Sequence, residues 1–145
     1  MLVKTFGYAV QGINATKITV EVNISTGVNF YMVGLPDNAV KESQQRIDTA
    51  LKQLGLKIPG KSVTINLAPA DIRKEGSAYD LTIAVGILGA NEQLKNEYLG
   101  ECVIMGELAL DGGLRPIKGA LPIAIQAKKD GFKTIILPKE NAPEA

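Results

Sequence analysis

Apolar and polar residues alternate strictly over residues 16–24, Thr-Lys-Ile-Thr-Val-Glu-Val-Asn-Ile. This period of two predicts a strand with one buried face. A Ser-Thr-Gly turn signal follows at 25–27, and residues 28–34 form the next apolar run. We therefore expect a hairpin between these two strands. Upstream, residues 2–13 predict either a strand pair or one strand bent at Gly7.

A helical period replaces the alternation in the next segment. Apolar residues recur between Val40 and Leu54 at helical spacing, and charged residues occupy the opposite face. This pattern predicts an amphipathic helix. Asp37 or Asn38 is suited to cap its N-terminus, and Gly55 is suited to end it.

The rest of the chain continues with strands and helices in alternation. We expect strands at 62–68, 102–110 and 133–138, helices at 78–90 and 119–129, and turns at Pro59-Gly60 and at Asp-Gly-Gly 111–113. Pairing of the first of these strands should stop near Pro69, which lacks an N–H donor. The pattern predicts a single α/β (α+β) domain of two layers, with helices packed on a mixed sheet.

The segment 78–90 is apolar on nearly all sides, so we expect its helix to be buried on most of its surface. Ser77 and Asp80 have the spacing of a capping box at the start of this helix. The segment 139–145 is polar and rich in alanine and proline. We interpret it as the start of a linker.

The amino-acid composition excludes several kinds of catalytic and metal site. The 145 residues contain no histidine, which excludes Ser-His-Asp and Cys-His catalysis and every metal site that uses histidine. The single cysteine, Cys102, lies in an apolar run and is expected to be a buried core thiol. A net charge of +1 predicts no strong field for nucleic acid or membrane. No signal peptide or membrane span is visible, so we expect a cytoplasmic protein.

The joint between the strand 62–68 and the next helix concentrates charge, and its residue types suit several kinds of site. Gly76 and Ser77 place free N–H groups at a helix start beside Arg73 and Lys74, which suits an anion. Ser77 with Lys74 or Lys118 has the residue types of a Ser-Lys hydrolase. A solvated turn is the plain alternative.

Two other chemistries have less support. No segment matches the phosphate-binding loop G-x-x-x-x-G-K-[ST], so nucleotide hydrolysis by that route is not predicted for this chain. Carboxylates occur at Asp71, Glu75, Asp80, Glu107 and Asp111 without calcium-loop spacing. We predict no metal site and no cofactor in this chain.

Three long blocks carry a family resemblance: YMVGLPDNAVKESQQRI (31–47), TINLAPADIRKEGSAYDLTIAVGIL (64–88) and MGELALDGGLRPIKGAL (105–121). They resemble the N-terminal domain of magnesium-chelatase-like AAA+ ATPases of the ComM/YifB type. The resemblance extends from about residue 7 to 141. It implies a Lon-protease-like domain at 1–138, followed at 139–145 by the start of a linker to an AAA+ module.

The same resemblance implies properties of the whole protein. The AAA+ module would bind ATP and Mg²⁺, and the full-length protein would form a homo-oligomer, a hexamer. Family members include a DNA helicase that assists branch migration in natural transformation. DNA is therefore a possible partner, together with the AAA+ module of the same polypeptide.

The domain is also similar to the proteolytic domain of Lon proteases, which uses a Ser-Lys dyad. Aligned on that motif, the nucleophile position falls on Ala78 and the lysine position on Leu121. Neither side chain can attack a carbonyl or move a proton. We therefore expect a non-catalytic interaction or regulatory domain. Its candidate contact loop comprises Arg73, Lys74, Glu75, Gly76, Ser77 and Asp80. The alternative is a Lon-like peptidase with a displaced dyad, Ser77 and Lys118.

Overall fold

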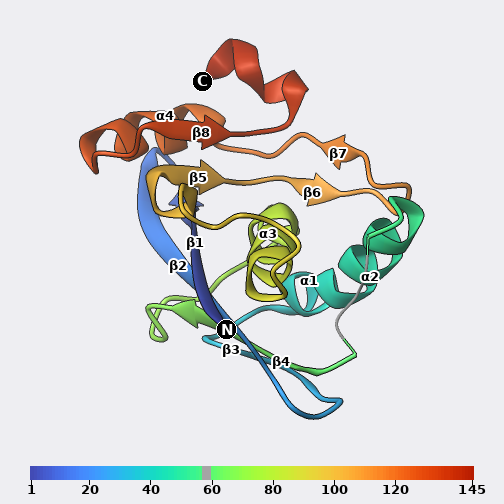
Figure 1. Ribbon diagram of the computed structural model, residues 1–145. Coiled ribbons are helices and arrows are strands. Elements are labelled where there is room, and N and C mark those ends of the chain that lie inside the picture. Colours follow the sequence, from blue (N-terminus) through green and yellow to red (C-terminus); the bar gives the residue numbers. More distant parts are fainter. Residues whose placement is uncertain (57–59) are drawn as a thin grey trace.

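The computed structural model describes residues 1–56 and 60–145. Within these ranges the main sheet has six strands in the spatial order β3-β4-β2-β1-β5-β8 (Figure 1). Its strands are β1 Leu2–Gln11, β2 Asn14–Ser25, β3 Phe30–Val33, β4 Ser62–Ala68, β5 Cys102–Ile104 and β8 Thr134–Ile136. A separate hairpin pairs β6 Glu107–Leu108 with β7 Leu114–Arg115.

The helices are α1 Asn38–Lys41, α2 Ser43–Gln53, α3 Asp80–Ala90 and α4 Ala120–Lys129, with 3-10 helices η1 at Leu99–Glu101 and η2 at Lys139–Glu144. The mixed α/β fold with helices packed on a mixed sheet is confirmed. No helix among the described residues has both the length and the apolar character needed to cross a membrane.

The β1–β2 pair is one long antiparallel hairpin, in register from Leu2↔Asn23 to Gln11↔Asn14. β1 therefore runs through Gly7 as a single strand. The expected hairpin between β2 and β3 is wrong, because β4 lies between them. β4 pairs antiparallel with β2 over seven residues, whereas β3 pairs with β4 in parallel over four. The longer ladder with β2 belongs to the strand that is more distant in sequence, and β3 becomes the edge of the sheet.

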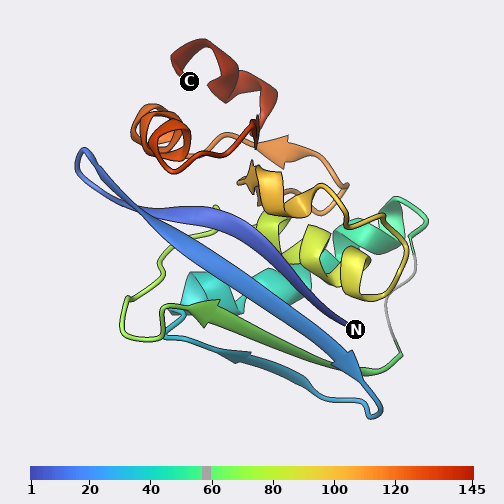
Figure 2. The ribbon, with the colours of Figure 1, turned by 60° about the vertical axis from the view of Figure 1, so that its left-hand side comes forward.

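Helix α3 packs against β1 and β2, with α2 beside it (Figures 1 and 2). The inward residues of the strands, among them Val20 and Val22, are fully buried under it. Gly86 allows this close packing, since a Cβ there would lie 2.7 Å from Val22 Cγ2. The predicted burial of α3 is confirmed. The buried hydroxyl of Thr82 in this helix is satisfied, because it donates to the Ile104 carbonyl.

The other face of β1 is covered at its C-terminal end. Phe6 and Tyr8 alternate with the residues under α3, so they point to the opposite side of the sheet. The Phe132 ring lies 5.5 Å from Phe6 and 6.3 Å from Tyr8, centroid to centroid. Helix α4, which ends just before Phe132, contacts β1 and β2.

Several boundaries differ from the prediction. The expected helix over 38–54 is interrupted at Glu42 and forms α1 and α2; Asp37 caps α1 as predicted, accepting from Val40 N at 2.8 Å. The expected strand over 102–110 divides into β5 and β6. Between them Gly106 N donates to the Ala78 carbonyl, which draws the chain away from β1 toward the start of α3.

Two of the predicted chain breaks and the C-terminal segment can be compared with the structure. β4 ends at Ala68, before Pro69, and the turn at 111–113 connects β6 to β7, both as predicted. Pro59 of the other predicted turn lies outside the described residues. Residues 139–144 form η2, where buried Asn141 accepts from Ile117 N at 2.8 Å and donates to the Ile117 carbonyl at 2.9 Å. The assignment of this segment as a linker stays a prediction.

Cys102 is half-buried rather than buried. It begins β5 next to η1, and its thiol donates to the Tyr98 carbonyl at 3.3 Å. The apolar run around it was misread, because Val103 and Ile104 take the fully buried positions of this short strand.

Candidate functional site

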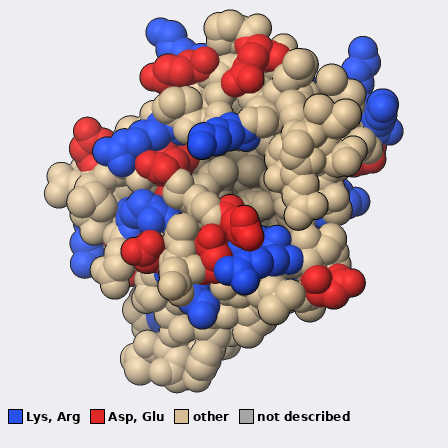
Figure 3. Space-filling model, turned by 180° about the vertical axis from the view of Figure 1, so that it is seen from behind, with Lys and Arg blue, Asp and Glu red and all other residues tan. Residues whose placement is uncertain are grey.

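A cleft of about 780 Å³ lies where the charged joint meets the C-terminal half of β1 and the segment before α4. Figure 3 shows it as a hollow with acidic and basic side chains around its rim. Most of its lining comes from residues 8–12 in and after β1, residues 75–79 before α3 and residues 116–119 before α4. Asp37, Met105, Glu107 and Ile123 complete it. Separate parts of the sequence thus form one concave surface, the usual form of a binding site.

Lys74 is fully buried at the base of the joint, with 0% of its surface exposed. Its Nζ donates to the carbonyls of Gly34 and Leu67, each at 2.7 Å, and to the carbonyl of Pro69. Three acceptors match the three N–H donors of an ammonium group. Burial lowers the pKa of Lys74, and the charge of Asp71 opposes that effect. The amine thus joins the ends of β3 and β4 to the loop that follows.

The joint is also tied to the loop before α1. Lys74 N donates to the Leu35 carbonyl at 3.0 Å, and Asp37 N donates to the Lys74 carbonyl at 2.9 Å. The Asp37 carboxylate caps α1 and also accepts from Gly76 N at 3.1 Å. The loop before α1 passes close to β4 at Gly34. Only glycine fits there, because a Cβ would lie 2.1 Å from the Leu67 oxygen and the φ of Gly34 is +103°.

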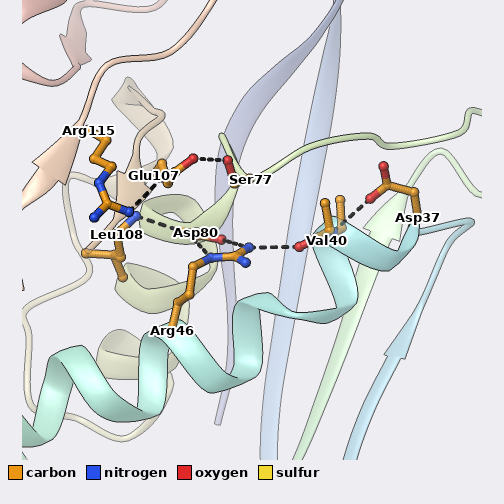
Figure 4. Close-up of polar contacts among 9 residues, drawn as sticks. Asp37, Val40, Arg46, Ser77, Asp80, Glu107, Leu108 and Arg115 are labelled. Carbon is orange, nitrogen blue, oxygen red and sulfur yellow. Dashed lines mark hydrogen bonds and ion pairs between the residues drawn. The ribbon is translucent and has the colours of Figure 1, made fainter. Parts of the chain in front are cut away.

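Asp80 holds three elements together at the first turn of α3. It accepts from Arg46 Nε at 2.6 Å and Nη2 at 2.8 Å, and from Leu108 N at 3.0 Å (Figure 4). Arg46 Nη2 also donates to the Ala39 carbonyl at 2.8 Å. Burial raises the pKa of Asp80, and the bonds from Arg46 and Leu108 oppose the rise. Arg46 and Asp80 thus form a bidentate ion pair at the junction of α2, α3 and β6.

Ser77 does not form the predicted capping box with Asp80. Its hydroxyl donates instead to Glu107 Oε1 from β6 (Figure 4). No side chain of the described residues caps α3. Glu107 also pairs with Arg115 at 3.3 Å. The hydrogen bond from Ser77 lowers the pKa of Glu107, and Arg115 lowers it further. Burial of Glu107 has the opposite, smaller effect. The prediction failed because Arg46 and Leu108, which are distant in sequence, bind the Asp80 carboxylate.

Two buried tyrosines line the cleft. The Tyr8 hydroxyl donates to Asp130 Oδ2 at 2.5 Å, which lowers the pKa of Asp130. Tyr79 is only 4% exposed, and among the described residues its hydroxyl has no hydrogen-bond partner. Burial raises the pKa of Tyr79, and the charges of Asp37 and Glu75 raise it further. Its hydroxyl therefore stays protonated.

The predicted contact loop is only partly a surface. Arg73 and Glu75 are exposed and form an ion pair at 3.2 Å. Gly76 and Ser77 are half-buried beside the cleft. Lys74 and Asp80 are 0% and 1% exposed, so their inclusion in a contact surface was wrong. Both charges are taken up by internal partners, carbonyl groups for Lys74 and Arg46 for Asp80.

The predicted dyad positions divide between the cleft and its surroundings. Ala78, Ser77 and Lys118 line the cleft, and Leu121 is 49% exposed on the first turn of α4. Among the described residues no hydrogen bond joins Ser77 to Lys118. Sequence reasoning missed Asp37, Glu107 and Tyr79 as parts of this site. The sequence marked Asp37 only as a helix cap and Glu107 only as one of several scattered carboxylates, and no local signal marks Tyr79.

Comparison with known proteins gives the family. Residues 20–141 match the family described as subunit ChlI of Mg-chelatase. The chain belongs to this magnesium-chelatase-like family. YifB of Escherichia coli strain K12 is 50% identical over 137 residues, which are 94% of this chain and 27% of that protein. Competence protein ComM of Haemophilus influenzae is 43% identical over 141 residues, 97% of this chain and 28% of that protein.

The predicted ComM/YifB resemblance is thereby confirmed. A second, more distant relationship is to Lon protease 2 of Bacillus subtilis, 31% identical over 101 residues, 70% of this chain and 18% of that protein. This supports the Lon-like character of the mixed α/β fold. The magnesium-chelatase-like chain spans little more than a quarter of the YifB and ComM proteins.

Proposed function

We propose that this chain is a non-catalytic interaction domain within a longer magnesium-chelatase-like ATPase of the ComM type. The observation that carries the proposal is the chemistry of the cleft. The positions that align with a Ser-Lys dyad are Ala78 and Leu121, and the neighbouring Ser77 hydroxyl donates a hydrogen bond to Glu107. The cleft has the shape of a binding site without an aligned nucleophile.

The local geometry also argues against a displaced dyad. A serine nucleophile needs a neutral amine that accepts its proton. Lys74 Nζ is surrounded by three carbonyls that it donates to, so it presents no free lone pair to Ser77. Lys118 is exposed, and among the described residues it makes no hydrogen bond to Ser77. The Ser77 hydroxyl faces a carboxylate that is already ion-paired with Arg115.

The rest of the proposal concerns the longer protein. An AAA+ module outside this chain would bind ATP and Mg²⁺ and assemble as a hexamer in the cytoplasm, with this domain packed near the ring. Support comes from the family and from ComM, which is named a competence protein. A role in handling DNA, such as branch migration, belongs to the same proposal.

The structure gives little support for direct DNA contact through the joint. Phosphate contact requires exposed, unpaired cations. Lys74 is buried, and Arg73 is paired with Glu75. We therefore place any DNA contact of the longer protein outside this joint.

A peptidase assay tests the proposed function. The chain should hydrolyse fluorescein-labelled casein no faster than its Ser77→Ala variant, because no group is placed to activate the hydroxyl. Trypsin serves as the positive control for the assay. Hydrolysis that disappears in both Ser77→Ala and Lys118→Met, with circular dichroism unchanged, would establish the displaced dyad and reject the proposal.

A further inference from the structure

We propose that the cleft binds a Lys or Arg side chain carried by an extended protein segment. This inference rests on the proposed function, because it names the class of partner that a non-catalytic interaction domain would take. It is carried by the carboxylates of the cleft, by a largely buried tyrosine whose accessible hydroxyl has no partner among the described residues, and by an open strand edge.

The cleft carries an excess of negative charge. Among the described residues, Asp37, Glu75 and Glu107 line it, and Lys118 is the one lining cation. Glu107 is engaged by Ser77 and Arg115, and Asp37 by two backbone N–H groups. Glu75 forms an exposed ion pair with Arg73, which a cationic ligand can replace. An ammonium or guanidinium group complements these carboxylates.

Tyr79 provides the second, independent observation. The ring of Tyr79 is buried, whereas its hydroxyl oxygen stays accessible at the cleft, where a ligand can reach it. This hydroxyl has no partner among the described residues, although the side chain is only 4% exposed and lines the cleft. The charges of Asp37 and Glu75, which also line the cleft, raise its pKa further. Its oxygen can accept an N–H from a cationic ligand.

The cleft also has apolar lining residues. They are Val10, Met105, Pro116 and Ile123. The long hydrocarbon stems of lysine and arginine pack on such surfaces while the charged end reaches polar groups. A volume of about 780 Å³ exceeds the needs of one side chain, so neighbouring residues of the ligand fit as well.

The open strand edge favours an extended segment. β1 pairs with β2 along its whole length, but among the described residues it pairs with β5 at Phe6 alone. Tyr8 and Val10, beyond that point, line the cleft. An extended segment placed there can add to the sheet through its backbone, a common mode of peptide recognition.

A peptide titration tests the inference on the 145-residue chain. The probe is acetyl-Ala-Leu-Arg-Leu-Ala-amide, and the matched peptide carries citrulline, which keeps the shape of arginine without its charge. We expect the arginine peptide to shift the amide resonances of Gly76, Ser77 and Gly119 in a saturable way. Loss of one charge-assisted contact should weaken binding of the citrulline peptide about tenfold.

Variants locate the site. Glu75→Gln should weaken binding of the arginine peptide about threefold to tenfold, and Tyr79→Phe should do so by a similar factor. Glu97→Gln is the control, because Glu97 is also exposed but does not line the cleft. Unchanged spectra of the free variants will show that they fold.

Three results would overturn the inference: equal affinity for the citrulline peptide, no saturable shift at millimolar peptide, or an oligonucleotide that shifts the same amides. Any of these together with an inactive casein assay removes this inference and leaves the proposed function intact. Ser77-dependent casein hydrolysis would reject both.

Discussion

Replacing Lys74 with methionine should lower the free energy of unfolding by about 3–5 kcal/mol. The methionine side chain approximates the volume of the lysine stem but donates no hydrogen bond. The carbonyls of Gly34, Leu67 and Pro69 would then lose the Nζ that now binds all three. An unsatisfied buried acceptor costs about 1–3 kcal/mol, and relief of burying an ammonium offsets part of the sum. Urea denaturation followed by circular dichroism measures the change.

The control for this prediction is Lys95→Met. Lys95 is exposed in the loop between α3 and η1, so its replacement should change stability by less than about 0.5 kcal/mol. Lys74→Arg should also destabilise the chain, because a planar guanidinium cannot replace a compact group that donates to three converging carbonyls. A loss within about 1 kcal/mol for Lys74→Met would contradict the structural role assigned to the amine.

The second large effect is expected at Asp80. Asp80→Ala should destabilise the chain by about 3 kcal/mol, because it leaves the Arg46 guanidinium and Leu108 N–H without their acceptor. Replacing both charged partners, as in Arg46→Met with Asp80→Leu, should recover part of this loss. An uncompensated buried charge is more costly than an absent pair. A double-mutant cycle by urea denaturation separates the terms.

The matched control is the exposed pair Lys133–Glu101, with its N···O distance of 3.4 Å. Its side chains are 74% and 47% exposed, against 20% and 1% for Arg46 and Asp80. Glu101→Ala should therefore cost less than about 1 kcal/mol. Equal losses of unfolding free energy for Asp80→Ala and Glu101→Ala would show that the buried ion pair stabilises the fold no more than the exposed one.

The sequence predicted those elements whose pattern is local. The alternation over 16–24 identifies β2, and the all-apolar segment after Ser77 identifies α3 as a buried helix. The β2–β3 pairing was mispredicted because neighbours in a sheet are chosen by competition among all strands. β4, about 40 residues after β2, offers the longer ladder. No local signal reports that competition.

The same distinction applies to the site. The joint around Ser77 was found from its charges and from its likeness to Lon, which are both sequence patterns. The burial of Lys74 was not foreseen, because its acceptors come from the end of β3, from β4 and from the following turn. Tyr79 was missed because an apolar pattern assigns it to the core. Only the assembled cleft shows that this side chain lines it and that its hydroxyl has no partner among the described residues.

The central claim is that the cleft holds no activated nucleophile. Intact-mass spectrometry after incubation with a fluorophosphonate tests it most directly, with subtilisin as the positive control and Ser77→Ala for comparison. The account predicts that the chain keeps its unmodified mass while subtilisin gains the adduct. A single adduct on the chain that is absent from Ser77→Ala would contradict the account.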